Sequence, residues 1–282
     1  MMGRIRPRYL FDHLNELRKL LASREKLAVF IDLDGALASI TPSPKLVRLK
    51  PETRVALESL LEDQRNRVVI LSGRMIEDLK SIVKLPEVTY VGNHGLEISG
   101  PGLEFVHSQA HDRVKLIEEL CGQVRSKLAA LEGVIVEFKA LSASVHYRLA
   151  TAQHHQIPQV VESIVAQHGD LVSTTEGRRV IEIRPNVAWN RSSAVQWILQ
   201  RFALEEEAAI YVGDDIGGEE AFAGLPRIIS IHVGTEYGNT SARFFARSPS
   251  GVLAFMQYLP IIRRPTMQSD LPAVTLPPAS VE

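Results

Sequence analysis

Three short apolar runs, each ending abruptly in polar residues, dominate the hydrophobic pattern of this chain. They are Leu27–Ile31, Val68–Leu71 and Ala208–Gly213. Continuous apolar runs of this length, bounded by turn residues, are typical of strands that are buried on both faces of a parallel sheet. A proline at the first turn of a predicted helix follows at Pro51, and a further helix is predicted near Met75–Val83. The pattern therefore indicates an α/β fold.

The pattern changes in the middle of the chain. The predicted elements there are a helix over Arg113–Leu131, strands over Val134–Phe138 and Ser142–Leu149, a helix over His154–His168 and a strand over Val180–Arg184. Apolar and polar residues alternate in these strands, as in antiparallel strands with one buried face. No long buried parallel strand occurs in this segment. We interpret it as a smaller α+β unit inserted into the sheet domain, with Ser99–Gly102 as the candidate hinge.

These patterns divide the chain into consecutive segments. We predict a helical leader over 1–26, the first part of the sheet domain over 27–100, an inserted lid over 101–185, the second part of the sheet domain over 186–262, and a proline-rich tail over 263–282. The tail is expected to be disordered because its composition offers little apolar surface to bury.

Composition narrows the functional classes. The formal net charge of the 282 residues is −1, so no general electrostatic attraction to nucleic acid or membrane is expected. A lone cysteine, Cys121, excludes an internal disulfide framework and suits a reducing compartment. No segment of transmembrane length and no signal peptide is recognisable. We expect a cytoplasmic protein.

Carboxylates follow two of the three buried runs. Asp32 and Asp34 lie two residues apart at the end of the first run and start on the same side of the strand, and Asp214-Asp215 follows the third. Acidic pairs meeting at one sheet edge are suited to Mg²⁺, and Ser72-Gly73-Arg74 offers a hydroxyl and backbone amides for a phosphate. The alternative for Asp32 and Asp34 alone is a strand-end turn whose aspartates cap backbone amides.

The order of these features resembles the haloacid dehalogenase (HAD) superfamily of phosphatases. The matching positions are Asp32-Leu33-Asp34-Gly35, Ser72, Arg191 and Asp214-Asp215. The resemblance implies a HAD-like Rossmannoid α/β core with a parallel sheet and an inserted α+β cap. The cap implied by the resemblance is the segment predicted above as the lid, residues 101–185.

The cap sequence narrows the resemblance. Glu137-Phe138-Lys139, Ser142–Arg148, Gly177–Pro185 and the Gly92–Glu97 turn resemble trehalose-6-phosphate phosphatases. The resemblance implies hydrolysis of trehalose 6-phosphate, with sugar hydroxyls held by the cap. The substrate-binding residues predicted in this way are Arg74, Asn93, His94, Glu137, Lys139 and Glu182. Without the resemblance, His94 in the glycine-flanked turn would be interpreted as a plain turn residue. Glu137 and Lys139 would likewise be interpreted as an exposed pair at a strand edge.

The superfamily also implies roles for the acidic motifs. Asp32 is implied as the nucleophile, Asp34 as the general acid and base, Ser72 and Arg191 as the groups that hold phosphate oxygens, and Asp32, Asp34, Asp214 and Asp215 as the Mg²⁺ site. Asp34 would reach the metal through its backbone carbonyl.

Several positions depart from the family pattern. Ala36 stands where a threonine is usual, Arg191 where a lysine is usual, and Gly217-Gly218 where threonine and aspartate are usual. Two alternatives therefore stay open. One is a phosphatase for a related sugar phosphate. The other is a degenerate phosphatase that binds a sugar phosphate, or a trehalose-phosphate synthase as partner, without turnover.

Overall fold

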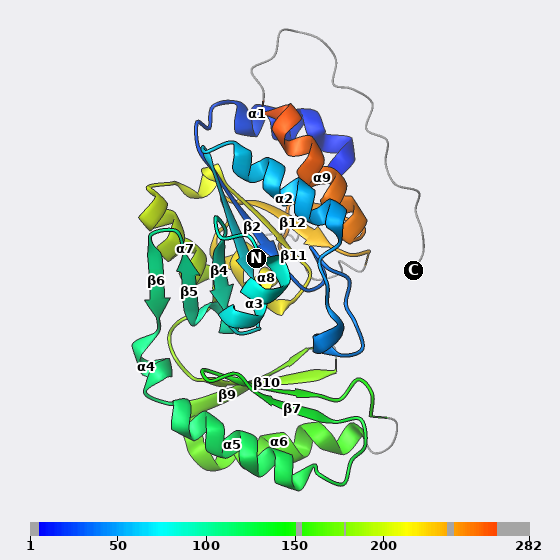
Figure 1. Ribbon diagram of the computed structural model, residues 1–282, viewed down its shortest axis with the longest axis vertical. Coiled ribbons are helices and arrows are strands. Elements are labelled where there is room, and N and C mark those ends of the chain that lie inside the picture. Colours follow the sequence, from blue (N-terminus) through cyan, green and yellow to red (C-terminus); the bar gives the residue numbers. More distant parts are fainter. Residues whose placement is uncertain (1–5, 151–153, 178, 236–239, 264–282) are drawn as a thin grey trace.

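The computed structural model describes residues 6–150, 154–177, 179–235 and 240–263. Two sheets organise these residues, a large nine-stranded one and a small four-stranded one. Figure 1 shows the small sheet below the large one, with helices α5 and α6 on the side of the small sheet that faces away from the rest. The predicted α/β fold, with a mostly parallel sheet as its core and an inserted α+β cap, is confirmed.

The large sheet has the strand order β1-β13-β12-β11-β2-β3-β4-β5-β6. Its strands, in that order, are Arg8–Tyr9, Phe244–Ala246, Ile229–Val233, Ala209–Gly213, Leu27–Asp32, Asn66–Leu71, Thr89–Gly92, Glu97–Gly100 and Leu103–Val106. All neighbours are parallel except β4–β5 and β5–β6. Strand β2 lies between β11 and β3, so the acidic ends of β2 and β11 meet at one edge.

Alternate residues of β2 face two different apolar layers. Val29 and Ile31 pack in one layer with helices α1 (Leu14–Ala22), α2 (Pro51–Glu62), α3 (Ile76–Val83) and α9 (Pro249–Ile262). Ala28 and Phe30 pack on the opposite face with α7 (Arg191–Phe202) and α8 (Ile216–Gly224). Because both faces of the strand are covered, its sequence is continuously apolar.

The cap consists of an antiparallel sheet covered by helices on one face. Its strand order is β7-β8-β10-β9, with bounds Ile135–Phe138, Ala143–His146, Val180–Pro185 and Val172–Gly177. Helices α5 (Val114–Lys127) and α6 (Ile157–Val165) share an apolar cluster with inward-facing residues such as Val145, Ile181 and Ile183. The other face of this sheet is turned toward the large sheet.

Two predicted segment boundaries need correction. Leu103–Val106 forms β6 and pairs with β5, so the cap does not begin at residue 101, and Ser99–Gly102 includes the turn of a hairpin in the large sheet. The leader is part of the core, because β1 pairs with β13 and Leu14, Leu17 and Leu21 of α1 are buried in the same apolar cluster as α9. The chain leaves the large sheet after Val106, through the short helix α4 (Ser108–His111).

The predicted tail and the first residues of the leader lie mostly outside the described part of the chain. Within the described part, no helix is both long enough and apolar enough to cross a membrane.

Candidate active site

A cavity of about 600 Å³ lies between the carboxyl edge of the large sheet and the open face of the cap sheet. This volume is within the range of small-molecule sites. All predicted site residues except Asn93 line it, namely Asp32, Asp34, Ser72, Arg74, His94, Glu137, Lys139, Glu182, Arg191, Asp214 and Asp215. Asn93 is buried beside the cavity and connects the two units, since it donates to Glu97 Oε1 at 2.7 Å and accepts from Ser142 Oγ at 2.5 Å.

Asp32 ends strand β2 and is 2% exposed. Its Oδ1 accepts hydrogen bonds from Arg191 Nη1 and from the Tyr211 hydroxyl, both at 2.9 Å. Its Oδ2 is buried and has no hydrogen-bond partner among the described residues. Burial raises the pKa of Asp32 well above its usual range, and the charge of Arg191 opposes this shift. The two oxygens are therefore unequal, one held and one available to a ligand.

Arg191 is the first residue of α7 and is 2% exposed. Asn190 caps this helix by accepting from Ser193 N, which fixes where the Arg191 side chain starts. Nη1 and Nη2 of Arg191 donate to the two oxygens of Asp215 at 2.8 and 2.9 Å. Asp215 also caps α8, accepting from the Gly218 amide at 2.8 Å. Arg191 thus joins the end of β2 to the start of α8.

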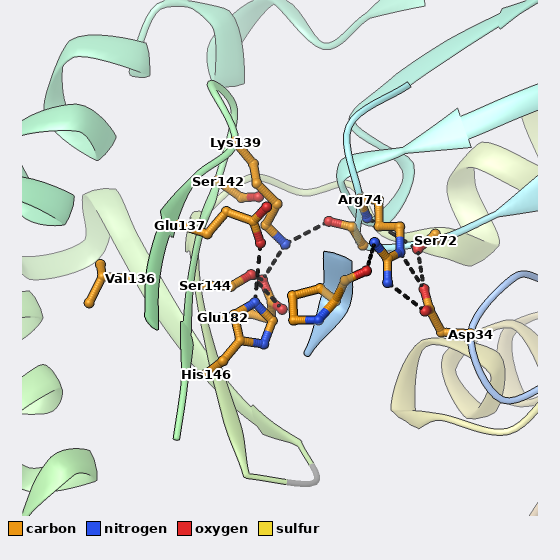
Figure 2. A network of polar contacts seen from close by, with 12 residues as sticks. Asp34, Ser72, Arg74, Val136, Glu137, Lys139, Ser142, Ser144, His146 and Glu182 are labelled. Carbon is orange, nitrogen blue, oxygen red and sulfur yellow. Dashed lines mark hydrogen bonds and ion pairs between the residues drawn. The ribbon is translucent and has the colours of Figure 1, made fainter. Parts of the chain in front are cut away.

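Asp34 is held by the turn after β3. Ser72 Oγ donates to its Oδ2 at 3.0 Å, and Arg74 donates through Nε to Oδ2 at 2.9 Å and through Nη2 to Oδ1 at 2.8 Å. Arg74 also donates through Nη1 to the Pro44 carbonyl at 3.0 Å. Figure 2 shows this group facing the cap residues across the cavity. Arg74, predicted to contact substrate, here orients the predicted acid and base.

Four aspartates were predicted to bind Mg²⁺, and the contacts of their side chains agree with this prediction for only some of them. Among the described residues, Asp32 Oδ2 is buried with no hydrogen-bond partner. The Asp214 carboxylate lies beside Gly35, where a Cβ built on the glycine would come within 1.9 Å of Asp214 Oδ2. Mg²⁺ is commonly held by one or two carboxylates, with water and substrate phosphate completing its shell. Both oxygens of Asp215 and of Asp34 already accept from arginines. The described side chains contain no cluster of three or more potential ligands. The side chains fit a cation held by Asp32 and Asp214, and the backbone-carbonyl ligand at Asp34 stays a prediction.

The cap presents a row of polar side chains across neighbouring strands. Glu137 on β7 is paired in register with Ser144 on β8, and Ser144 with Glu182 on β10. Glu182 accepts from Ser144 Oγ at 2.9 and 2.8 Å and from Lys139 Nζ at 3.0 Å, and His146 lies 3.1 Å from Glu137. Figure 2 shows this row pointing toward Asp34 and Ser72.

Lys139 connects the cap to the core directly. Its ammonium donates to the Gly73 carbonyl at 2.6 Å, in the turn that also carries Ser72 and Arg74. Its other partner is Glu182. A single buried lysine therefore contacts both the predicted phosphate-binding turn and the predicted sugar-binding row.

His94 lies in a strained turn beside Glu182. Asn93 and His94 both have positive φ, 45° and 58°, which costs free energy in residues other than glycine. His94 Nε2 is 3.3 Å from Glu182 Oε2, and its side chain is 14% exposed. Burial lowers the pKa of His94 from 6.5 to about 4, although Glu182 opposes the shift. His94 is therefore neutral near pH 7.

This pKa predicts a pH-dependent stability. Because the folded pKa is depressed from 6.5 to about 4, the unfolded chain binds the proton first as the pH falls. Neutral His94 therefore contributes fully to the free energy of unfolding above the unfolded-state pKa. This contribution is lost as the pH falls toward the folded-state pKa. We expect the free energy of unfolding to fall less in His94→Asn than in the wild type when the pH is lowered from about 7 to 5. Urea titrations at each pH measure this free energy. His111→Asn, in an exposed histidine, is the control, and equal slopes for wild type and His94→Asn would contradict the prediction.

Sequence reasoning missed Tyr211. Its hydroxyl binds the predicted nucleophile, but it stands in the middle of the apolar run of β11, where it is read as a core residue. The only signal is a hydroxyl within a strand that is otherwise fully apolar. Ser144, at the centre of the cap row, was likewise predicted only as a strand residue.

Comparisons with known proteins agree with this geometry. Residues 30–250 match the model of the trehalose-phosphatase family. The chain is 32% identical over 242 residues to a trehalose-phosphate phosphatase of Mycobacterium tuberculosis, which covers 82% of this chain and 61% of the relative. It is 31% identical to a probable trehalose-phosphate phosphatase 3 of rice, covering 84% of this chain and 70% of the relative. The chain thus spans about three fifths of the mycobacterial relative.

A solved structure shares the fold. It is the C-terminal domain of a trehalose-6-phosphate phosphatase from C. albicans, with a TM-score of 0.73 at 20% identity, and it covers 91% of this chain and 98% of that one. The family match spans most of the chain, including both acidic motifs and the whole cap. This protein belongs to the trehalose-phosphatase family.

Proposed function

We propose that this protein hydrolyses trehalose 6-phosphate to trehalose and inorganic phosphate with the help of Mg²⁺. One observation carries the proposal: Asp32 and Asp34 line the same cavity as the cap carboxylates Glu137 and Glu182, which can accept hydrogen bonds from hydroxyl groups. The pairing of a nucleophilic carboxylate with hydroxyl acceptors is what hydrolysis of a sugar phosphate requires. Family membership supports the same reaction.

In the first step, a carboxylate oxygen of Asp32 attacks phosphorus. A bond forms between this oxygen and phosphorus, while the bond between phosphorus and the sugar oxygen breaks. Asp34 gives its proton to the departing sugar oxygen, which leaves as the 6-hydroxyl of trehalose. Ser72 and Arg191 hold the non-bridging oxygens. The phosphoryl group is then an ester of Asp32.

In the second step, water attacks the phosphorus of this ester. Asp34, now a carboxylate, takes a proton from the water, the bond between Asp32 and phosphorus breaks, and inorganic phosphate leaves. Asp32 and Asp214 would hold Mg²⁺, which would supply positive charge that keeps Asp32 ionised and offsets the charge of the phosphate. Ser72 and Arg74 Nε both donate to Asp34 Oδ2, whereas Oδ1 accepts from Arg74 Nη2, so we assign the proton transfers to the second lone pair of Oδ1.

The cap selects the sugar. Carboxylates accept hydrogen bonds from hydroxyls, and a site built on such bonds rejects analogues that lack them. Glu137, Glu182 and Lys139 are the side chains we assign to this contact. A trehalose-phosphate synthase would supply the substrate. Association with such an enzyme and location in the cytoplasm stay predictions.

The test is phosphate release from trehalose 6-phosphate by the purified chain with Mg²⁺, beside a panel of other sugar phosphates. Release that is selective for trehalose 6-phosphate and lost with EDTA is expected. Release from a different sugar phosphate would keep the mechanism and overturn the assignment of the cap.

A second candidate is a protein that binds trehalose 6-phosphate without turnover. The observation that favours it is that arginines occupy Asp32 Oδ1, Asp34 and Asp215. Calorimetric binding of trehalose 6-phosphate without phosphate release from any tested substrate would establish this candidate and refute the enzyme.

The role of Glu137 gives a specific prediction. Glu137→Gln exchanges a carboxylate for an amide of the same shape, so we expect kcat/KM for trehalose 6-phosphate to fall about tenfold. For p-nitrophenyl phosphate, which has no sugar hydroxyls, kcat/KM should change by less than about twofold. An equal loss on both substrates would show that Glu137 acts on the phosphoryl chemistry or on the fold.

A further inference from the structure

The guanidinium of Arg191 lies where a side chain at position 217 would be. Gly217 is in the first turn of α8, and a Cβ built on it would come within 2.5 Å of Arg191 Cζ and Nε and within 2.8 Å of Cδ. Carbon atoms that are not bonded to each other do not approach so closely. Any residue other than glycine at this position therefore requires Arg191 to move.

Arg191 has little freedom to move. It is 2% exposed, and its fork is fixed by the bond to Asp32 and the bidentate pair with Asp215. A shift of the guanidinium away from α8 would break the planar geometry of this pair. It would also leave Asp32, which is buried, without its cation.

We propose that Gly217 is a positioning residue: its missing side chain creates the space from which Arg191 bridges Asp32 to Asp215. This inference rests on the proposed function insofar as Asp32 is the nucleophile. It also links arginine at 191 and glycine at 217 through one steric contact. The atoms that a Cβ would meet, Cδ, Nε and Cζ of Arg191, have counterparts in a lysine chain. A lysine lacks the planar fork that fixes Arg191 to Asp32 and Asp215, so its flexible chain can turn away from a side chain at position 217.

The neighbouring glycine has a different environment. A Cβ on Gly218 would come no closer than 3.4 Å to Asp32 Oδ2 and to Gly213 Cα, which is ordinary contact. The coupling is therefore specific to position 217, and the absence of an aspartate at 218 has no explanation in this contact.

A double-mutant cycle tests the coupling. The proteins are the wild type, Gly217→Ala, Arg191→Lys and the double variant, and the measurements are kcat/KM for trehalose 6-phosphate and the midpoint of thermal unfolding. In the Arg191 background we expect Gly217→Ala to lower kcat/KM about tenfold or more and to lower the midpoint by several degrees. In the Arg191→Lys background the same change should alter kcat/KM by less than about twofold and should leave the midpoint unchanged or higher.

Gly122→Ala is the matched control, because Gly122 is also inside a helix and a Cβ there would meet nothing within 4 Å. It should leave activity unchanged and should not lower the midpoint. Equal losses from Gly217→Ala in both backgrounds, or no loss in either, would overturn the proposal. If Gly217→Ala does not fold, recovery of folding by Arg191→Lys supports it, and failure in both backgrounds refutes it.

The unfolding cycle separates the two proposals. If the wild type releases no phosphate, the proposed function fails, but the thermal midpoints still report whether position 217 and Arg191 interact. If the wild type is active and the midpoints are additive, the function stands and the coupling fails.

Discussion

Asp32→Asn is expected to lower phosphate release from trehalose 6-phosphate by at least about 1,000-fold, the scale of losses when a covalent nucleophile is removed. The amide has the shape of the carboxylate, so Oδ1 can still accept from Arg191 and from the Tyr211 hydroxyl. It lacks the charge that attack on phosphorus requires. The measurement is initial phosphate release at saturating Mg²⁺.

The fold should survive this change. Burial raises the pKa of Asp32, which means that the folded state pays to ionise it, so the neutral amide should not lower the thermal midpoint. Asp12→Asn, at an exposed aspartate far from the cavity, is the control and should keep full activity. More than a tenth of the wild-type rate in Asp32→Asn would exclude Asp32 as the nucleophile.

Arg191→Met is expected to lower the free energy of unfolding by about 3 kcal/mol, the low end of the range for breaking a buried ion pair. Methionine fills most of the apolar volume but offers no donor. Asp32 would then be buried beside Asp214 and Asp215, which raise its pKa, without the guanidinium that lowers it. Equilibrium urea unfolding near pH 8 is the measurement, and phosphate release should be lost at the same time.

The pH dependence identifies the cause of this loss. Without Arg191 the folded-state pKa of Asp32 lies even further above its unfolded value, so the folded state binds more protons than the unfolded one. Lowering the pH should therefore stabilise Arg191→Met relative to the wild type, and the difference should shrink from pH 8 to pH 6. Arg227→Met removes an arginine that is 58% exposed and paired with Glu206 and Glu207, and it should cost less than about 1 kcal/mol. Equal losses in both variants would show that packing, not the buried charge, is responsible.

Strand identity and the acidic motifs could be predicted from local sequence alone. Strands such as β2 and β11 are covered on both faces, so they contain only residues that tolerate full burial, and their apolar runs are recognisable without a partner. The position of Asp32 at the end of one run, and of Asp214-Asp215 just after the other, follows from the same runs. This is why the fold class was predicted correctly and why eleven of the predicted site residues line one cavity.

Strands with few apolar residues could not be predicted in this way. Strand β9 reads VSTTEG and has a single buried residue, Val172, so its identity depends on pairing with β10. The edge strand β1 is two residues long and exists because β13 offers an unpaired edge. The β5–β6 hairpin extends the large sheet across the boundary that glycines and a proline suggested.

Side-chain partnerships were decided by the tertiary structure alone. Asp32 and Arg191 are 159 positions apart, and Asp32 and Tyr211 are 179 apart, so nothing in either local sequence identifies the partner. Local sequence was enough to predict which residues carry charge at the sheet edge. The packing of α7 and α8 against β2 places Arg191 against one oxygen of Asp32 and places Gly217 where it leaves room for the Arg191 side chain. Such contacts between distant segments depend on how the elements pack, and the periodicity of each element does not reveal them.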